Sequence, residues 1–277
     1  MDTVMSKTDA LNATVKQYHS ALVAFSGGID STVMLKAAMD QLGSQNVKAV
    51  VANSELFSDE EFNKAIELGH SLGVEVVETK IAYLANDDVR HNTPNSWYAA
   101  KKLFYERMNE LKRQYKSDVV FDGIIYDDLA DYRPGLKARD EEKAVSPLEI
   151  NGFTKADVRD LARQYQLTNW NKVPSCSVSS RFPYNTTITQ EKITMVMKSE
   201  AYLRSLGFDT VRVRVHDTVA RIEVPADKMT ALLALNTSVN ATLKGYGFKY
   251  VSLDLGGFIS GHMNDELSDE QVKAYHE

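Results

Sequence analysis

The 277-residue chain contains a single cysteine, Cys176, and this scarcity excludes several kinds of site. One cysteine cannot form an internal disulfide, nor can it supply the several thiolates of a structural zinc or iron–sulfur site. The six histidines show no H-x-x-x-H spacing that would favour zinc. Because a lone thiol stays reduced in the cytoplasm, we predict a cytoplasmic protein.

Long apolar runs and excess positive charge are also lacking. No stretch approaches the roughly 18 apolar residues of a membrane span, and residues 1–20 lack the apolar core of a signal peptide. The formal net charge is -6, within an otherwise ordinary globular composition. Since proteins that bind nucleic acid usually present a basic surface, the acidic balance argues against tRNA or DNA as a partner, and nothing indicates a membrane partner.

In the first half of the chain, short apolar runs alternate with segments of helical periodicity. This alternation predicts an α/β fold with a parallel sheet covered by helices. Thr154 and Asp157 have the spacing of a capping box before a later helix, which follows the loop-rich segment 122–152. The expected strands are 21–25, 47–52, 74–77 and 119–121, and the expected helices are 31–42, 58–72 and 96–115.

The last third has a different pattern, and we expect a first domain over 1–186 and a smaller α+β domain over 187–277. Thr187 and Gln190 have the spacing of a capping box before a helix that ends at Leu206. Apolar and polar residues then alternate strictly, as in strands with one buried face. The further elements expected are strands at 211–216, 220–224 and 249–255 and a helix over 227–244.

The most specific motif is Ser26-Gly27-Gly28-Ile29-Asp30-Ser31, between an expected strand and an expected helix. Its glycines permit close backbone approach, and the N–H groups at the helix start favour an anion. Ser26 and Ser31 add hydroxyl donors. The Asp30 carboxylate would repel phosphates unless a cation intervened, which predicts Mg²⁺ bridging Asp30 and a polyphosphate. The alternative is a plain strand–helix turn with Asp as the N-cap.

This motif resembles the loop of the PP-loop ATP pyrophosphatases, which cleave ATP between its α and β phosphates and adenylate a substrate. The lysine of a Walker A loop is absent. The resemblance implies a parallel-sheet, HUP-like (adenine nucleotide alpha hydrolase-like) domain that uses ATP and Mg²⁺. It also implies adenine contacts from Asn53 and Ser54 after the second strand, and a contact from Asp122 and Gly123 after the fourth.

Further segments narrow the resemblance to one branch. They are Asp127 to Arg139, Ser146 to Arg159, Trp170 to Tyr184 and Asp254-Leu255-Gly256-Gly257-Phe258. As an ordered set over nearly the whole chain, they resemble the LarE family, the ATP-dependent sacrificial sulfur transferases of nickel-pincer cofactor synthesis. One departure is Asn185, where the family pattern has Gly. Asn tolerates the left-handed backbone better than most residues, so the turn can survive.

The LarE resemblance implies a reaction at Cys176. A carboxylate of pyridinium-3,5-biscarboxylic acid mononucleotide is adenylated, and the Cys176 thiolate displaces AMP to form a thioester. Removal of the cysteine α-proton then breaks the Cβ–S bond. The product leaves as a thiocarboxylate, and dehydroalanine remains in the protein. Which base removes that proton is left open.

The residues around Cys176 suit this chemistry. Lys172 and Arg181 flank the cysteine, and cations favour the thiolate that sulfur attack requires. Lys101 could also face the thiol, and we count it among the nucleotide contacts. The alternative is a buried structural cysteine. Against that, the polar Ser-Cys-Ser stretch between prolines is a poor core. A single cysteine also disfavours the persulfide-relaying tRNA thiolases, which need a second thiol.

Arg212 and Arg214 alternate with valines and so lie about 7 Å apart on one face of a strand. Two guanidiniums at that spacing suit a substrate phosphate or carboxylate, and the resemblance adds Ser180 and Arg181 to the substrate contacts. The alternative is a solvated sheet face in which Arg221 and Glu223 pair with the arginines.

Two more residues are candidates with open alternatives. Trp97 could stack on the ring of the substrate or be buried by its helix. Glu200 could be a metal ligand or a base, or it could lie on an ordinary helix surface.

Three other functions remain open for the chain as a whole. An ammonia-dependent amidotransferase related to NAD synthetase would share the loop but need no cysteine. A tRNA thiolase would need a basic face, and a nucleotide sensor would release no pyrophosphate. LarE relatives self-associate, so we expect a homo-oligomer.

Overall fold

The computed structural model describes residues 2–129, 134–171 and 177–259, with side chains from residue 7 onward. The chain divides into two compact units, the first formed by residues 1–82 and 97–175 and the second by 83–96 and 176–277. The boundary therefore lies near 175 rather than 186, and residues 83–96 group with the C-terminal part. The reason is Asn92, whose side-chain amide donates to the carbonyls of Phe182 and Pro183 at 2.9 and 3.0 Å.

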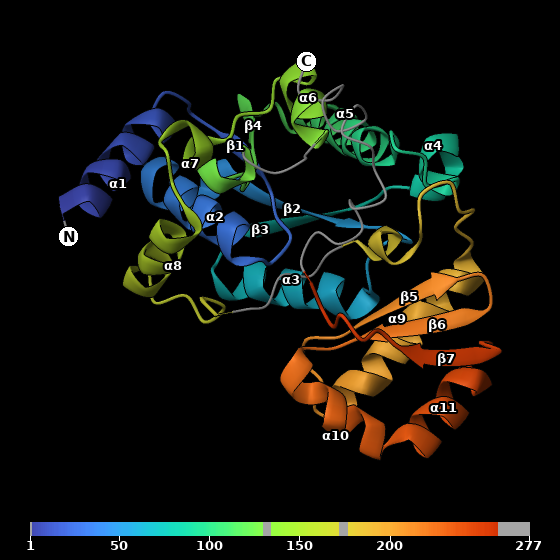
Figure 1. Ribbon diagram of the computed structural model, residues 1–277. Coiled ribbons are helices and arrows are strands. Elements are labelled where there is room, and N and C mark those ends of the chain that lie inside the picture. The colour runs from blue at the N-terminus through green and yellow to red at the C-terminus, as the bar shows by residue number, and fades with distance from the viewer. Residues whose placement is uncertain (1, 130–133, 172–176, 260–277) are drawn as a thin grey trace. The chain divides into compact units, whose positions relative to one another are not determined.

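The first unit is built on a parallel sheet, as the sequence predicts. Its strand order is β3-β2-β1-β4, and all three pairings are parallel (Figure 1). In the register, Ala21 lies opposite Val47 on one side and Val119 on the other. The strands are β1 (Ala21–Ala24), β2 (Val47–Asn53), β3 (Glu75–Lys80) and β4 (Val119–Phe121).

Helices cover both faces of this sheet, and β1 and β4 in particular are apolar on both sides. Val23 and Phe121 belong to a core with α1, α2, α3 and α8, whereas Leu22 belongs to a core with Met108 and Leu111 of α5. A continuous apolar run is typical of strands buried in this way. The helices are α1 (Asp2–Val15), α2 (Ile29–Leu42), α3 (Asp59–Ser71), α5 (Ser96–Tyr115) and α8 (Lys155–Gln164).

Side-chain caps begin two of these helices where the sequence predicts. Ser58 accepts a hydrogen bond from the Glu61 amide, and Thr154 and Asp157 form the full capping box. Helix α1 was not predicted, because its segment is mostly polar and contributes few residues, such as Leu11, to the core. Two short helices, α6 (Gly135–Glu141) and α7 (Pro147–Ile150), lie in the segment expected to be loop-rich.

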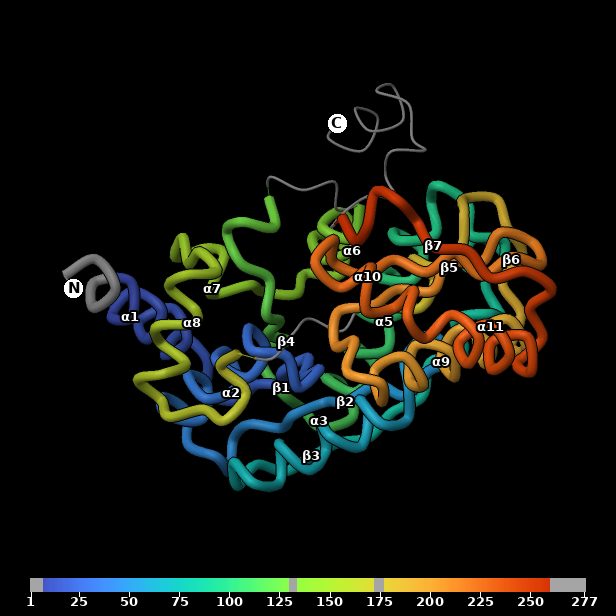
Figure 2. The backbone as a smooth tube through the Cα atoms, turned by 60° about the horizontal axis from the view of Figure 1, so that its bottom comes forward, coloured from blue at the N-terminus to red at the C-terminus, as the bar shows by residue number. Residues whose placement is uncertain are grey.

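The second unit is a small α+β fold with a mixed sheet. Strands β5 (Arg212–His216) and β6 (Val219–Glu223) pair antiparallel, and β6 and β7 (Tyr250–Leu253) pair parallel. Helix α9 (Gln190–Ser205) contacts β5, and α11 (Asn236–Gly245) contacts β7 and α9 (Figure 2). This unit also contains α4 (Asp87–Arg90) and the single-turn helix η4 (Val178–Arg181).

Two local predictions in the second unit are wrong. The cap of α9 is Thr189, which accepts from the Lys192 amide, whereas the Thr187 hydroxyl lies 3.1 Å from His91 Nδ1. The helix expected over 227–244 is interrupted after α10 (Met229–Ala234). The Asn-Thr-Ser sequence that follows Leu235 has side chains that favour helix starts over helix interiors.

The turn at Asn185 survives as expected. Asn185 has φ of +61°, and its amide donates to the Asn92 carbonyl at 2.9 Å. Glycine adopts this backbone without strain, and asparagine is among the residues that tolerate it best. In the part of the chain that the structure describes, no helix has the length and apolar character needed to cross a membrane.

Candidate active site

The predicted phosphate loop joins β1 to α2 and is tightly folded. Gly27 has φ of +67°, and a Cβ there would lie 3.1 Å from Cα of Ala65 in α3. Any side chain at this position would meet both backbone strain and the neighbouring helix. The Ser31 hydroxyl donates to the Gly28 carbonyl at 3.0 Å and lies 3.2 Å from the Ser26 hydroxyl. The loop therefore has one well-defined path into the start of α2.

The chain after β4 lies directly against this loop. A Cβ on Gly123 would be 2.7 Å from the Ser31 amide nitrogen and 2.9 Å from Ser31 Cα. Both contacts are with backbone, so they could not be relieved by moving a flexible side chain. Gly123 is thus required for the close approach of the chain after β4 to the N-terminal end of α2. The sequence analysis likewise expects Gly123 directly after the fourth strand.

Asp30, in the first turn of α2, is held by a cation from another helix. Lys155, the first residue of α8, donates to both carboxylate oxygens of Asp30 at 2.8 and 2.7 Å. The Lys155 amide also donates to Asp127 at 2.8 Å. The Asp30 carboxylate is therefore neutralised by a positive charge, as the sequence analysis expects. The cation in the structure is the Lys155 ammonium, whereas the sequence predicts Mg²⁺.

Mg²⁺ at this position would have few ligands from the protein itself. No three His, Cys, Asp or Glu side chains gather into a possible metal site anywhere in the described residues. Mg²⁺ commonly takes one or two carboxylates and completes its shell with phosphates and water, which fits Asp30 beside a polyphosphate. For Asp30 to bind Mg²⁺, its contact with Lys155 must loosen.

Asp122, at the end of β4, is buried and fixed in place. The Tyr105 hydroxyl donates to one of its carboxylate oxygens at 2.7 Å, and the Ile124 amide donates to the other at 3.1 Å. Burial raises the pKa of Tyr105 well above its usual value, and the Asp122 charge adds to the effect. Tyr105 therefore stays a hydrogen-bond donor at any working pH.

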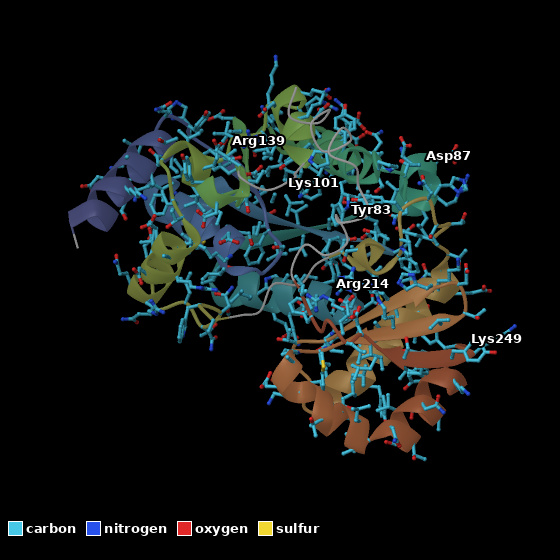
Figure 3. The ribbon with its side chains drawn as sticks, in the orientation of Figure 1. Tyr83, Asp87, Lys101, Arg139, Arg214 and Lys249 are labelled. Carbon is cyan, nitrogen blue, oxygen red and sulfur yellow. The ribbon has the colours of Figure 1, made fainter. Side chains whose placement is uncertain are left out.

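Lys101 belongs to α5 (Figure 3). It precedes Tyr105 by one helical turn. Its ammonium is 5.3 Å from the centre of the Phe104 ring and 5.9 Å from that of Tyr105. A Cβ on Gly135 would lie 2.6 Å from Lys101 Cγ, so the glycine of the Pro-Gly pair makes room for the lysine stem. Trp97, near the start of the same helix, is half-buried.

The residues expected to contact adenine lie at the carboxyl end of β2. Asn53 is the last residue of that strand, and its carbonyl accepts from the Ile81 amide at 3.0 Å. The Ser54 hydroxyl oxygen is buried but has no hydrogen-bond partner among the described residues. A buried hydroxyl without a partner is unfavourable, and a polar ligand would satisfy it. These residues thus fit a nucleotide base at this edge of the sheet.

In the second unit, Glu200 is at the centre of a buried network. Its carboxylate accepts from Arg181 Nε at 2.8 Å, Arg181 Nη2 at 3.2 Å, the Val213 amide at 3.1 Å and Arg204 Nη1 at 3.3 Å. Burial raises the pKa of Glu200, but the charge and hydrogen bonds of Arg181 outweigh it, so the net pKa is lowered. In this conformation the carboxylate is ionised and has four donors, which leaves little capacity for a metal ion.

Arg214 is also held by a buried carboxylate. Its Nε donates to Glu223, which is fully buried, and its Nη1 donates to the Ser180 carbonyl at 2.8 Å. Arg221 Nη2 donates to the same Glu223 oxygen at 3.1 Å. Glu223 thus pairs with arginine as the plainer sequence interpretation expects, yet the pairing also fixes the direction of the Arg214 guanidinium.

The other predicted substrate contacts lie around this pair. Arg212 is half-buried, with its guanidinium carbon 5.2 Å from the centre of the Phe258 ring. The Ser180 hydroxyl accepts from Arg181 Nη1 at 2.6 Å. The structure therefore brings Ser180, Arg181, Arg212 and Arg214 together in one unit. Cys176 and Lys172 lie outside the described residues.

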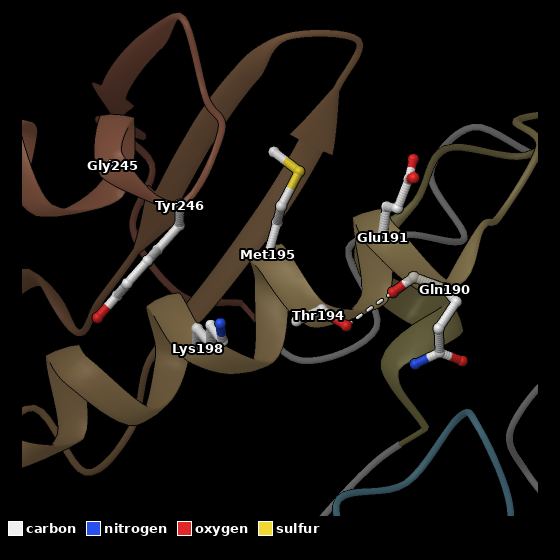
Figure 4. A pocket seen from close by; sticks show the side chains of 7 residues that line it. All are labelled: Gln190, Glu191, Thr194, Met195, Lys198, Gly245 and Tyr246. Atoms are coloured by element: carbon white, nitrogen blue, oxygen red, sulfur yellow. Dashed lines mark hydrogen bonds between the residues drawn. The ribbon is translucent and has the colours of Figure 1, made fainter.

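An open cavity of about 510 Å³ lies beside α9 (Figure 4). The Thr194 hydroxyl on its wall is already bonded to the Gln190 carbonyl at 2.8 Å. No predicted site residue lines it. Its lining consists of Gln190, Glu191, Thr194, Met195, Lys198, Gly245 and Tyr246.

Comparison with known proteins places the chain in a family. The profile of the NAD synthase family matches residues 3–112, which contain the phosphate loop and the first three strands. A pyridinium-3,5-bisthiocarboxylic acid mononucleotide synthase of Lactiplantibacillus plantarum is 54% identical over 99% of this chain and 100% of its own length. The chain belongs to the LarE family.

Two further relatives differ in how much of the chain they cover. An uncharacterised Synechocystis protein is 37% identical over 95% of this chain and 98% of its own. By contrast, the ammonia-dependent NAD synthetase of Helicobacter hepaticus is 40% identical over only 24% of each chain. The LarE family resemblance therefore extends over the whole chain, whereas the NAD synthetase resemblance covers part of it. Family membership implies that the loop binds ATP.

The sequence does not single out several residues that contact the predicted site residues. Lys155 was noted only as part of a family segment, although it neutralises Asp30, 125 positions away. Two others are Tyr105, which donates to Asp122, and Asn169, whose side-chain amide donates to the Gly27 carbonyl at 3.0 Å. Tyr105 has no local signal because an aromatic residue at helical spacing usually belongs to the core. Each acts through a contact that only the fold creates.

Proposed function

We propose that this chain is an ATP-dependent sacrificial sulfur transferase that converts a carboxylate of pyridinium-3,5-biscarboxylic acid mononucleotide into a thiocarboxylate. The observation that carries the proposal is the 54% identity, over the whole chain, to a synthase named for the bisthiocarboxylic acid product. A thiocarboxylate contains sulfur that its carboxylate precursor lacks. The reaction therefore needs both activation of the carboxylate and a sulfur donor.

Activation is the role of the first unit. The N–H groups at the start of α2 and the hydroxyls of Ser26 and Ser31 would hold the phosphates of ATP. Lys155, released from Asp30, would contact the departing pyrophosphate, while Asp30 would hold Mg²⁺, which neutralises phosphate charge. A substrate carboxylate oxygen attacks the α-phosphorus, and the bond to pyrophosphate breaks. The product of this step is an acyl-adenylate.

Sulfur donation is the role of Cys176. Its thiolate attacks the acyl carbon, and AMP leaves with the bonding electron pair. A base then takes the cysteine α-proton, and those electrons form the Cα–Cβ double bond as the Cβ–S bond breaks. The substrate leaves as a thiocarboxylate, and the protein retains dehydroalanine. One protein molecule is consumed for each sulfur delivered.

Binding of the substrate's anionic groups is the role of the second unit. Arg212 and Arg214 are consecutive on one face of β5, and Ser180 lies beside Arg214. Glu223 offsets only part of this positive charge. A phosphate or carboxylate at this face would make charge-assisted hydrogen bonds to the guanidiniums. Trp97, a residue of the first unit, is proposed to stack on the pyridinium ring.

The alternative function is amide formation with ammonia, as in NAD synthetases. The NAD synthase profile over residues 3–112 favours it. That profile ends before Cys176 and before the arginines of β5, so it accounts for the ATP module alone. An amidotransferase would use no protein sulfur, and the two functions therefore predict different fates for the cysteine.

The proposal is tested by incubating the protein with ATP, Mg²⁺ and the biscarboxylic acid nucleotide and analysing the products. We expect pyrophosphate, AMP and a thiolated nucleotide with no added sulfur source. A requirement for ammonia and an amide product would support the alternative instead. ATP binding without pyrophosphate release would indicate a nucleotide sensor.

The cellular setting and assembly belong to the same proposal. A cysteine that must remain a free thiol is suited to the cytoplasm. We also propose a homo-oligomer, which light scattering of the purified protein would test. A monomer at working concentration would contradict that part of the proposal without affecting the chemistry.

A further inference from the structure

The side chain of Asn169, in the segment after α8, reaches the backbone of the phosphate loop from outside the loop. Its amide nitrogen Nδ2 donates to the Gly27 carbonyl at 3.0 Å and to the Thr32 hydroxyl at 2.9 Å. Thr32 is fully buried on α2. The two contacts therefore join a residue 142 positions from Gly27 to both ends of the loop.

The orientation of this amide is fixed by its partners. The Gly27 carbonyl can only accept a hydrogen bond. The Thr32 hydroxyl donates its single proton to the Gly28 carbonyl at 2.8 Å. It can therefore only accept a hydrogen bond from Asn169. Both contacts therefore require the NH₂ side of the amide. The Asn169 oxygen is buried without a partner among the described residues, so the amide keeps this orientation at a cost.

These contacts determine where the loop N–H groups point. A trans peptide is planar, and its N–H points opposite to its C=O. Holding the Gly27 carbonyl therefore sets the direction of the Gly28 N–H, which in the unliganded chain donates to the Ser26 hydroxyl at 3.3 Å. Thr32 and Ser31 hold the Gly28 carbonyl in the same way and set the Ile29 N–H. Gly27 has φ of +67°, and glycine by itself would allow other orientations.

We propose that Asn169 is a positioning residue that fixes two successive peptide planes of the phosphate loop and so sets the directions of the Gly28 and Ile29 N–H groups that would meet the phosphates of ATP. This inference rests on the proposed use of the loop for ATP. Asn169 makes no contact with the reacting atoms and acts through Gly27 and Thr32. Its expected effect is on the affinity for ATP rather than on the chemical step.

Asn169→Asp tests the inference most sharply, because it keeps the shape and replaces the donor with a carboxylate. At pH 8 the carboxylate would face two acceptors and push the loop away. We expect KM for ATP in pyrophosphate release to rise about tenfold or more, with a smaller change in kcat. As the pH falls towards 5, protonation would restore one donor, and the KM ratio of variant to wild type should decrease.

The chain contains a matched control in Asn151. Its amide also donates to a threonine hydroxyl, of Thr14 at 3.1 Å, and to a carbonyl, of Pro147 at 2.7 Å. That threonine also donates to a carbonyl, of Ala10 at 3.0 Å. These contacts join α1 to α7 and involve no loop residue. Asn151→Asp should therefore match the stability change of Asn169→Asp but leave KM for ATP within about twofold of wild type.

The outcomes separate this inference from the proposed function. This inference alone would be overturned if the wild type releases pyrophosphate and Asn169→Asp has the same KM for ATP as the wild type at every pH. A wild type that releases no pyrophosphate would overturn the proposed function and this inference with it. If Asn169→Asp does not fold, Asn169→Ala should still raise KM for ATP about fivefold relative to Asn151→Ala, and an equal KM would contradict the inference.

Discussion

Lys155 and Asp30 form an ion pair in which the lysine ammonium donates to both carboxylate oxygens, at 2.8 and 2.7 Å. One partner is in the first turn of α2 and the other is the first residue of α8. In the unliganded chain, the lysine supplies the positive charge that a metal ion is proposed to supply with ATP. The Asp30 carboxylate is thus neutralised by Lys155 in the unliganded chain.

Lys155→Gln removes this charge and is expected to weaken ATP binding when Mg²⁺ is scarce. Asp30 would then repel the triphosphate, and we expect KM for ATP to rise about tenfold or more at limiting Mg²⁺. Saturating Mg²⁺ should recover much of the loss, because the metal ion can neutralise Asp30. Pyrophosphate release measured over a Mg²⁺ titration checks this.

Lys36→Gln is the control for that variant. Lys36 pairs with Asp40 on the solvent-exposed side of the same helix, so its removal subtracts the same charge without touching the loop. Its KM for ATP should stay near that of the wild type. Equal effects of the two variants, or an effect of Lys155→Gln that ignores Mg²⁺, would contradict a local role for Lys155.

Glu200 should contribute stability that depends on pH. Burial raises the pKa of Glu200, but Arg181 lowers it further, so the folded pKa lies below the ordinary value of 4.5. A depressed carboxyl pKa contributes stability that is fully present above the unfolded value and is lost as the pH falls through the folded one. Glu200→Gln should cost about 3 kcal/mol of unfolding free energy at pH 7, because the buried Arg181 loses its counter-charge.

Urea unfolding of both proteins between pH 7 and pH 4 measures this. The difference in unfolding free energy should narrow as the pH drops below about 4.5. A constant difference would mean that the Glu200 carboxylate is not held ionised by Arg181. A loss of wild-type stability on adding a chelator would instead favour the metal-ligand role that the sequence suggested.

Substitutions of Arg212 and Arg214 should have different effects, although both residues lie on the same face of β5. The first should affect substrate binding and the second stability. Arg214→Ala leaves Glu223 buried with only Arg221 as a partner, and we expect it to lower the unfolding free energy by about 2–3 kcal/mol. The Arg212 charge also lowers the pKa of Glu200, but Arg181 has the larger effect, so Arg212→Ala leaves that carboxylate its main counter-charge. It should raise KM for the nucleotide substrate about tenfold while the melting temperature stays within about 2 °C.

Melting curves and substrate titrations of the two variants separate these effects. Arg214→Lys adds a further check, since a lysine keeps the charge but cannot hold Glu223 and the Ser180 carbonyl with one planar group. Equal loss of stability in Arg212→Ala and Arg214→Ala would show that Glu223 does not distinguish them.

The backbone conformation of Asn185 predicts that alanine and glycine substitutions there change the unfolding free energy by different amounts. At φ of +61°, Asn185→Ala should destabilise by about 1 kcal/mol, because a Cβ without a polar tip is disfavoured there. Asn185→Gly should remain within about 0.5 kcal/mol of the wild type. Denaturant unfolding checks both. A more stable alanine variant would contradict the strain argument.

The sequence is informative wherever the fold depends on neighbouring residues. Strands β1 and β4 are predictable because burial on both faces makes them continuous apolar runs. The capping box of Thr154 and Asp157 is predictable because it depends only on residues close in sequence. The phosphate loop is recognisable for the same reason. Its glycines are required by backbone geometry within a few residues of one another.

Contacts between distant segments are what the sequence could not reveal. Asn92 joins residues 83–96 to the chain around Phe182, 90 positions later, so the unit boundary is missed. Lys155 and Asn169 reach the loop only after α8 has packed beside α2. A polar residue at the start of a helix or in a loop has no local sequence pattern that indicates which distant residue it contacts in the fold.

The central claim, that Cys176 gives up its own sulfur, is tested most directly by the intact mass of the protein after turnover. With ATP, Mg²⁺ and the biscarboxylic acid nucleotide, the account predicts that each chain that has made product loses the mass of one H₂S, and that Cys176→Ala makes no thiolated product. An unchanged protein mass alongside thiolated product, or thiolation by Cys176→Ala, would contradict it.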